Sequence, residues 1–219
     1  GDNANAMVPA ALIRWAEVES QTIIQRALAP LVRSGRVRRD LPLVFCLDNP
    51  PADPATAEAL AAAGLTFSVG EDEMTRPTSN GPEARLPDGL ALRSWDESTA
   101  PLFFHAYSEA FRARPGFPHW DEARWRAAFA SDAAFRADLS CVVLDGPEPA
   151  AFVIAWVEDR TGWSTQMGVR EGWRGQGIGE GLIALTLGVF AAGGIETAAL
   201  EVATNNPEAR ALYERMGFR

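Results

Sequence analysis

Apolar residues in the second half of the chain recur at two spacings, and each spacing predicts a different kind of element. Between residues 101 and 112, Phe103, Tyr107 and Ala110 recur every three or four positions, which places them on one face of a helix. Short apolar runs bounded by glycine or proline predict strands instead. The expected elements, in order, are strand 90–95, helices 101–112 and 120–130, strands 140–144, 150–158 and 161–169, helix 179–192, strand 198–203 and helix 207–216.

The first part of the chain carries a shorter set of signals. A long helical pattern covers 7–33, and its Pro30 is expected to bend or end the helix. An apolar strand at 43–47 leads through a proline turn into an alanine-rich helix at 54–63, with Asp53 as its N-cap and Gly64 at its end. Residues 65–74 then predict a further strand.

These two parts of the chain present their signals in the same order. Strand, Asp-Asn-Pro, alanine-rich helix and Gly-Leu at 43–65 parallel strand, Asn-Asn-Pro, alanine-rich helix and Gly-Phe at 198–218. The parallel favours an internal repeat, with an unrelated α/β extension as the alternative. A segment rich in Pro, Ser, Asn and Gly predicts a linker. We therefore expect an N-terminal unit at 7–76, a linker at 77–88 and the main domain at 89–219.

Composition and charge narrow the classes of function. The 219 residues carry a net charge of −9, which argues against nucleic acid as the main partner and mildly favours an amine ligand. No apolar run is long enough to span a membrane and no signal-peptide pattern opens the chain, so we expect a cytoplasmic protein without a membrane partner. Cys46 and Cys141 lie in apolar runs and are expected to be buried thiols, and no metal site is expected.

The stretch most informative about chemistry is a glycine-rich turn between a strand and a helix, Arg174-Gly175-Gln176-Gly177-Ile178-Gly179. The free N–H groups at the start of such a helix bind anions, so a phosphate-rich ligand is expected. The turn lacks the Gly-Lys-Ser/Thr ending of a nucleotide-triphosphate loop. It also fails the dinucleotide fingerprint, because Glu180 or Leu182 stands where the last glycine is required.

The spacing Arg-x-x-Gly-x-Gly after a strand resembles the pyrophosphate-binding motif of the GNAT (Gcn5-related) N-acetyltransferases. A second signature follows at 200–218, where a strand, an Asn-x-x-Ala-x-x-Leu-Tyr helix and Gly-Phe resemble the end of the family's domain. The resemblance implies an α/β (α+β) GNAT fold, with a mixed, mostly antiparallel central sheet flanked by helices. It also implies that the N-terminal unit is a partial, degenerate copy, because that unit lacks the glycine motif.

The resemblance further implies acetyl-CoA as acetyl donor and direct transfer to a primary amine of a small molecule in a ternary complex. In the family the strand before the turn splays from its neighbour, which puts Met167, Gly168 and Val169 against the pantetheine. An N–H near Val169 would polarise the acetyl carbonyl. The charge of Arg174 lies beside the pyrophosphate, which the backbone N–H groups of the turn would hold. These belong to Gly175, Gln176, Gly177, Ile178, Gly179 and Glu180.

Three further residues receive roles from the resemblance, each with an alternative. Tyr213 is expected to be the general acid for the departing thiolate, or else a packed core tyrosine. Glu201 is a candidate general base. Alternatively, a water chain takes the proton of the amine, and Glu201 is only an exposed strand residue. Asn206 either contacts the cofactor or only caps the helix after it. Glu109 and His119 are weaker candidates for the base.

The acceptor is less defined by the sequence. Residues 111–118 resemble those of actinobacterial tandem GNAT proteins, the group that includes mycothiol synthase, so mycothiol synthase-like acetylation is a more specific alternative. The alternative from another class is a non-catalytic acyl-CoA sensor or interaction module. A monomer and a homodimer both remain open. The family adds a final strand after Gly-Phe, whereas the given sequence stops at Arg219. Either that strand is missing here or another element fills its place, and residues 65–74 are a candidate for that role.

Overall fold

The computed structural model describes residues 70–114, 117, 119–129 and 132–219. The helices and strands expected before residue 65, Cys46 and the first copy of the proposed repeat therefore lie outside the described residues. The compact unit to which the described residues belong runs from Val69 to Arg219.

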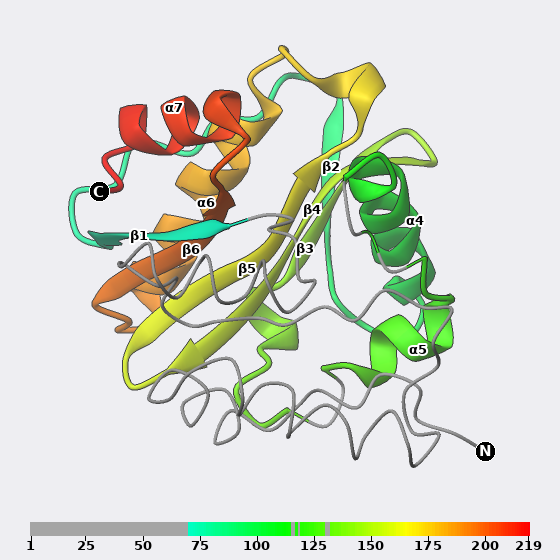
Figure 1. The fold of residues 1–219 in the computed structure, drawn as a ribbon, viewed down its shortest axis with the longest axis horizontal. Helices are drawn as coiled ribbons and strands as arrows, with labels where there is room; N and C mark the ends of the chain where they lie inside the picture. Colours follow the sequence, from blue (N-terminus) through cyan, green and yellow to red (C-terminus); the bar gives the residue numbers. More distant parts are fainter. Residues whose placement is uncertain (1–69, 115–116, 118, 130–131) are drawn as a thin grey trace, which may run out of the picture. The chain divides into compact units, whose positions relative to one another are not determined.

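A six-stranded mixed sheet forms the centre of the unit, with the strand order β1-β6-β5-β4-β3-β2 (Figure 1). Every neighbouring pair is antiparallel except β5 and β6, which are parallel. This confirms the expected mixed, mostly antiparallel sheet. The strands are β1 Glu71–Pro77, β2 Leu90–Ser94, β3 Cys141–Asp145, β4 Glu148–Glu158, β5 Thr161–Val169 and β6 Thr197–Ala203.

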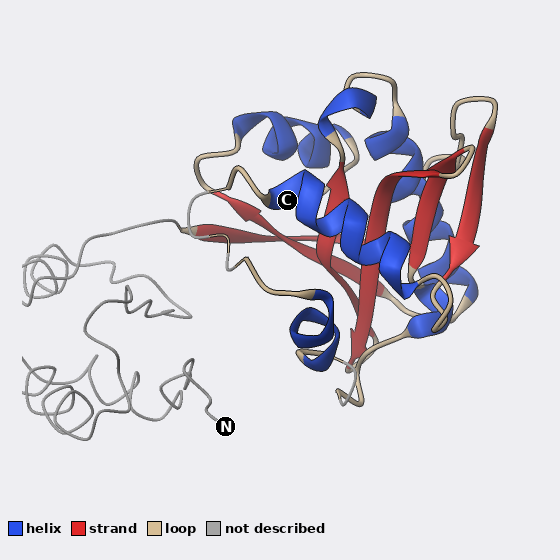
Figure 2. Cartoon of the chain, turned by 90° about the vertical axis from the view of Figure 1, so that its right-hand side faces the viewer, coloured by secondary structure: helices blue, strands red, loops and turns tan. Residues whose placement is uncertain are grey.

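Helices cover both faces of this sheet (Figure 2). On one face, α4 and α5 bury an aromatic core that includes Phe103 and Trp125 against Phe152 of β4. On the other, α6 and α7 bury side chains such as Leu187 and Tyr213 against β6. The helices are α4 Ala100–Phe111, α5 Glu122–Ala127, α6 Ile178–Ala192 and α7 Pro207–Arg215, with short 3-10 turns at η1 Ala137–Leu139 and η2 Glu171–Trp173.

Most expected elements are present with shifts of one to three residues at their ends. The clearest difference is α5, which was expected over 120–130 and spans only 122–127. It begins where the side chain of Asp121 accepts the N–H of Arg124 as an N-cap. Cys141 is buried, as expected, and burial raises the pKa of its thiol to about 12.

The strand expected at 65–74 and the linker expected at 77–88 need correction. Residues 75–77 belong to β1, so the strand extends to Pro77, and residues 65–69 lie outside the described part of the chain. The segment that follows contains no helix or strand, yet it packs closely along α6. The buried Thr78 hydroxyl donates to the Ile195 carbonyl at 2.6 Å. Proline and glycine content predicted the absence of regular structure there, but it carries no information about packing.

β1 is the strand that lies beside β6 at the edge of the sheet. Glu71 to Pro77 pair antiparallel with Ala203 to Thr197. On its other edge, the Thr75 backbone exchanges two hydrogen bonds with Arg219, the last residue. The segment suggested for this role at 65–74 is thus partly the one that fills it, and Met74, with 3% of its surface exposed, anchors it in the core.

Candidate active site

An opening in the sheet lies between β5 and β6. The two strands pair only at their starts, where Thr161, Gly162 and Trp163 lie opposite Thr197, Ala198 and Ala199. Beyond Trp163 they diverge toward the glycine-rich turn, as Figure 1 shows. The second half of β5 therefore has its backbone paired with β4 on one side only, among the residues that the structure describes.

The direction of the β5 backbone groups follows from one hydrogen bond. The Arg170 N–H donates to the Ala150 carbonyl on β4 at 2.9 Å. Successive residues of a strand point their backbone groups to opposite sides, so Gly168 also faces β4, whereas Met167 and Val169 face the opening. The Val169 carbonyl agrees with this, because it accepts a hydrogen bond from Arg174 Nε at 3.0 Å.

Close packing against α4 explains why residue 168 is a glycine. A Cβ added there would lie 2.9 Å from the Ala110 Cβ and 3.2 Å from the Phe152 ring. Only glycine lets α4 approach β5 this closely. Gly168 therefore packs against α4, and its two neighbours present their backbone groups to the opening.

The glycine turn at the end of β5 has the backbone that its sequence predicts. Gly175 and Gly177 have φ values of +73° and +81°, in the left-handed region that favours glycine. A Cβ at either position would meet nothing within 4 Å, so the outer side of the turn is open. The first hydrogen bond of α6 runs from the Gly181 N–H to the Gly177 carbonyl. The N–H groups of Ile178, Gly179 and Glu180 precede it and have no partner within the helix.

The side chains around the turn are largely tied to the protein. Arg174 donates to the Val169 carbonyl and, at 3.3 Å, to the Ala110 carbonyl of α4, so its cation holds the turn against the ends of two elements. Gln176 donates to the Gly172 carbonyl at 3.2 Å. Glu180 pairs with Arg215 of α7 at 3.1 Å. What the turn offers outward is therefore its backbone.

Tyr213 lies on the α6 and α7 face of the sheet. Its side chain has 9% of its surface exposed and packs on Phe218, with ring centroids 6.1 Å apart. Burial raises the pKa of its phenol to about 12, so the hydroxyl keeps its proton at neutral pH. The core position is one of the two alternatives expected for this residue, and the role of general acid stays a prediction.

Glu201 lies on the opposite face. Its β6 neighbours Leu200 and Val202 are in the core under α6 and α7, so the alternation of the strand turns Glu201 toward the α4 and α5 side. Partial burial raises the pKa of its carboxyl, although the residue keeps contact with solvent. Repulsion from Glu71 and Glu73 raises that pKa further, and the charge of Arg114 opposes the rise.

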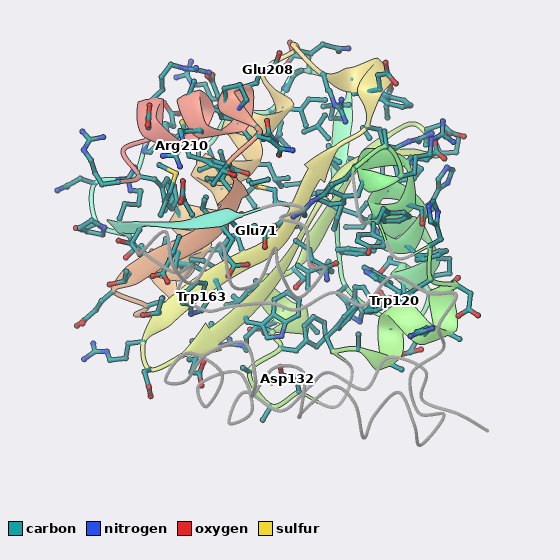
Figure 3. All side chains as sticks on the ribbon, in the orientation of Figure 1. Glu71, Trp120, Asp132, Trp163, Glu208 and Arg210 are labelled. Atoms are coloured by element: carbon teal, nitrogen blue, oxygen red, sulfur yellow. The ribbon has the colours of Figure 1, made fainter. Side chains whose placement is uncertain are left out.

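These charged neighbours of Glu201 are the functional candidates that the sequence did not indicate. Glu73 lies directly opposite Glu201 in the β1–β6 pairing, and Glu71 pairs with Arg114, which follows α4. Figure 3 shows Glu71 at the end of β1 nearer to β5. These residues lie far from Glu201 in the sequence and left no local signal, apart from the acidic run Glu71-Asp72-Glu73 at the start of β1.

Asn206 and Gln166 each accept a hydrogen bond near the site. The side chain of Asn206 accepts the Ala209 N–H at 3.1 Å, so it caps α7, which is the structural alternative for this residue. Gln166 of β5 accepts the Trp125 indole N–H at 3.0 Å, which links the aromatic core under α4 and α5 to the edge of the opening. This amide was not among the expected site residues.

The splayed parallel strands, the glycine turn and the Asn-capped helix with its tyrosine match the features expected from the resemblance to the GNAT acetyltransferases. The family model described as "Acetyltransferase (GNAT) family" matches residues 94–218, more than half of the chain. The chain belongs to this family.

Three curated relatives are named mycothiol acetyltransferase. The protein of Beutenbergia cavernae is 29% identical over 182 residues, which cover 75% of this chain and 60% of the relative. That of Corynebacterium efficiens is 33% identical over 116 residues, covering 52% and 38%. That of Streptomyces coelicolor is 28% identical over 180 residues, covering 71% and 52%. The chain thus spans between about two fifths and three fifths of the length of these relatives.

Solved structures share the fold at low identity. A GCN5-related N-acetyltransferase from Sphaerobacter thermophilus has a TM-score of 0.72 at 19% identity, covering 90% of this chain and 63% of its own. A functionally unknown conserved protein from Staphylococcus epidermidis has a TM-score of 0.60 at 16% identity, covering 78% and 65%. None of the helices that the structure describes is long and apolar enough to span a membrane.

Proposed function

We propose that this chain transfers an acetyl group from acetyl-CoA directly to a primary amine of a small molecule. The observation that carries the proposal is the opening between β5 and β6, which leads to a glycine turn with free backbone donors. A pantetheine chain fits such an unpaired strand edge because it can hydrogen-bond to the backbone as an added strand does. The family membership supports acetyl-CoA as the donor.

The residues proposed to hold the donor divide into two groups. Met167 and Val169 offer backbone groups to the pantetheine, and Arg174 keeps the turn in place. The pyrophosphate is proposed to lie on the outer side of the turn, where the helix dipole and unpaired N–H groups favour an anion. These N–H groups are those of Gly175, Gln176, Gly177, Ile178, Gly179 and Glu180.

The proposed reaction places one proton-transferring group on each face of the sheet. Bound acetyl-CoA supplies a thioester, whose carbonyl carbon gains a bond from the amine nitrogen and loses its bond to sulfur. The Val169 N–H donates to the carbonyl oxygen while it carries negative charge. Glu201 accepts the proton of the amine from the α4 and α5 side. Tyr213 gives its proton to the departing sulfur from the α6 and α7 side.

The acceptor is proposed to enter from the face of α4 and α5. That face brings together the carboxylate of Glu201, the acidic β1 residues and the end of α4. Negative charge there favours an amine, which arrives as a cation and must lose its proton before it attacks. The name of the curated relatives makes the amine whose acetylation gives mycothiol the first acceptor to test.

A thiol-release assay with acetyl-CoA and a panel of small amines tests this function. We expect turnover with at least one amine, and mass spectrometry should find the acetyl group on the amine and none on the protein. Coenzyme A binding without turnover on any amine would favour the sensor or interaction module instead. An acetylated protein side chain that forms and decays during turnover would contradict direct transfer.

A further inference from the structure

A cavity of about 460 Å³ lies at the start of β5, beside the segment that follows α5. Two indoles, two carboxylates, an amide and a methyl group line it, and they belong to Trp156, Trp163, Asp132, Glu158, Gln166 and Ala134. Figure 3 shows Trp163 on β5 and Asp132 in the segment after α5. None of these side chains has a role in the acetyl transfer proposed above.

The two indoles of the cavity share one face of the sheet. Trp156 and Trp163 lie directly opposite each other in the β4–β5 ladder, so their side chains point to the same side. The ring of Trp156 packs on Phe129, with centroids 5.8 Å apart, which is the α4 and α5 side. On the other side, a Cβ at Gly162 would lie 2.5 Å from the Phe190 ring of α6. Both indoles are only partly buried, so ring surface is left for a ligand.

An extra residue in β5 brings Gln166 to this face as well. From Trp163 to Gln166 the ladder takes three steps along β5 but only two along β4. Such a bulge reverses the alternation of the strand, so Gln166 faces α5 instead of α6. Its amide oxygen accepts the Trp125 indole N–H at 3.0 Å, which fixes the side chain at the end of the cavity nearer to Met167 and the sheet opening.

The segment after α5 closes the cavity and is tied to β4 through its backbone. The Val157 N–H donates to the Ala134 carbonyl at 2.8 Å. Two residues further, the Arg136 N–H donates to the Ala155 carbonyl at 2.9 Å. The Asp132 carboxylate accepts the Ala134 N–H at 2.9 Å, which holds this charge beside the cavity. The lining is therefore positioned by the fold.

The chemistry of the lining favours a cationic ligand. The face of an indole attracts an ammonium group through the quadrupole of the ring, and tryptophan does so best among the aromatic side chains. Asp132 and Glu158 add negative charge, which repels an anion. Exposed carboxylates alone contribute little, so it is their combination with two indoles in one cavity that defines the site.

We propose that this cavity holds a second positive charge of the acceptor, and that the acceptor is an elongated diamine. The inference rests on the proposed function, in which the reacting amine reaches Glu201 from the same face of the sheet. Trp163 lies opposite Ala199 of β6, and Glu201 lies two residues further, about 7 Å along the strand. An acceptor whose reacting nitrogen is at Glu201 therefore reaches the indoles with its second ammonium group.

Steady-state acetylation of 1,6-diaminohexane and of 6-amino-1-hexanol by the full chain tests this assignment. The two acceptors share one carbon chain, and the second carries a hydroxyl where the first carries the distal ammonium group. The wild type should favour the diamine about tenfold in kcat/KM, above the factor of about two that its two equivalent amino groups provide. The difference should lie in KM, because the distal contact is the same before and during transfer.

Two variants and a matched control assign the preference to the cavity. Trp163→Leu and Glu158→Gln should each raise KM for the diamine and leave kcat, and both constants for the amino alcohol, within twofold of the wild type. Melting curves check that each variant is folded. Glu196→Gln removes an exposed carboxylate that lies beside the β4–β5 turn, pairs with Arg160 at 2.7 Å and does not line the cavity. This control should keep the wild-type preference.

Equal kcat/KM for the two acceptors in the wild type would overturn the assignment while the proposed function stands. A preference that survives in both cavity variants, or that Glu196→Gln also loses, would do the same. Turnover of other amines without turnover of the diamine would overturn the assignment as well. If no amine is acetylated, the proposed function fails and the assignment fails with it.

Discussion

At the residue scale, the two glycines with positive φ connect the sequence to the cofactor most directly. Gly175 and Gly177 were recognisable because a motif with fixed spacing places glycine where the backbone must turn left-handed and stay uncovered. Glu73 and Arg114 were not recognisable, since they reach Glu201 only through strand pairing and a loop distant in sequence. Local backbone requirements can be inferred from local sequence, whereas the charges around a side chain depend on the whole fold.

Gly177→Glu should abolish coenzyme A binding. The new side chain would project into the open outer side of the turn, and its charge would repel the pyrophosphate. Because φ is +81° there, we also expect the free energy of unfolding to fall by about 1–2 kcal/mol. Titration calorimetry and a melting curve measure the two effects. As a control, Gly188→Glu adds the same charge at an open position in the middle of α6 and should keep full affinity for coenzyme A. If Gly177→Glu also kept its affinity for coenzyme A, the pyrophosphate site would be refuted.

Glu73→Gln should move the acid limb of the kcat/KM profile to lower pH. A general base must be deprotonated, and the charge of Glu73 raises the pKa of the Glu201 carboxyl. Without that charge the carboxylate forms at lower pH, so activity persists further into the acid range. Arg114→Gln should shift the limb the other way, because the arginine lowers the same pKa. If the acid limbs of the two variants shift in the same direction, or if neither shifts, Glu201 is not the general base.

Tyr213→Phe should lower kcat by about a hundredfold while the Kd for coenzyme A stays within twofold. The hydroxyl acts when the sulfur departs, so its loss belongs to the transition state rather than to binding. Its pKa of about 12 keeps it protonated over the whole working range, so this variant should not alter the acid limb. Stopped-flow thiol release and calorimetry give the two quantities. An unchanged kcat would leave Tyr213 a core residue and nothing more.

At the scale of elements, the periodicity of apolar residues predicted nearly every helix and strand after residue 89. It could not predict where β1 pairs, because strand pairing is set by contacts between distant segments. The proline-rich segment after β1 illustrates the same point, since its role as a wall beside α6 depends on Gly181 a hundred residues later. Figure 3 shows Arg210 on α7, which pairs with Asp72 and ties this helix to β1.

Met74→Ala should test whether β1 is an integral part of the sheet. Met74 has 3% of its surface exposed and packs in the core of β6, α6 and α7. Truncating a buried methionine costs about 2–5 kcal/mol of the free energy of unfolding. Leu92→Ala on β2 removes a side chain that is 40% exposed and should change that free energy by about 0.5 kcal/mol or less. Chemical denaturation compares them, and a loss in Met74→Ala as small as in Leu92→Ala would contradict the place of β1.

At the scale of the whole molecule, we propose that the two motifs of the main domain share one site. In this proposal the glycine turn supplies the backbone for phosphate and α7 supplies Tyr213, from segments distant in the sequence. We propose that the N-terminal unit, expected as a degenerate copy, binds no coenzyme A, because it lacks a glycine turn of this kind. The chain should therefore bind a single coenzyme A.

The most direct test of the central claim is amide hydrogen exchange along β5 during a titration with coenzyme A. If the pantetheine lies in the opening, the amides of Met167 and Val169 gain protection, which saturates at one coenzyme A per chain. The Gly168 amide, which faces β4, should change little and serves as an internal control. Protection of Gly168 without its neighbours, or coenzyme A binding that leaves Met167 and Val169 unprotected, would contradict the proposed site.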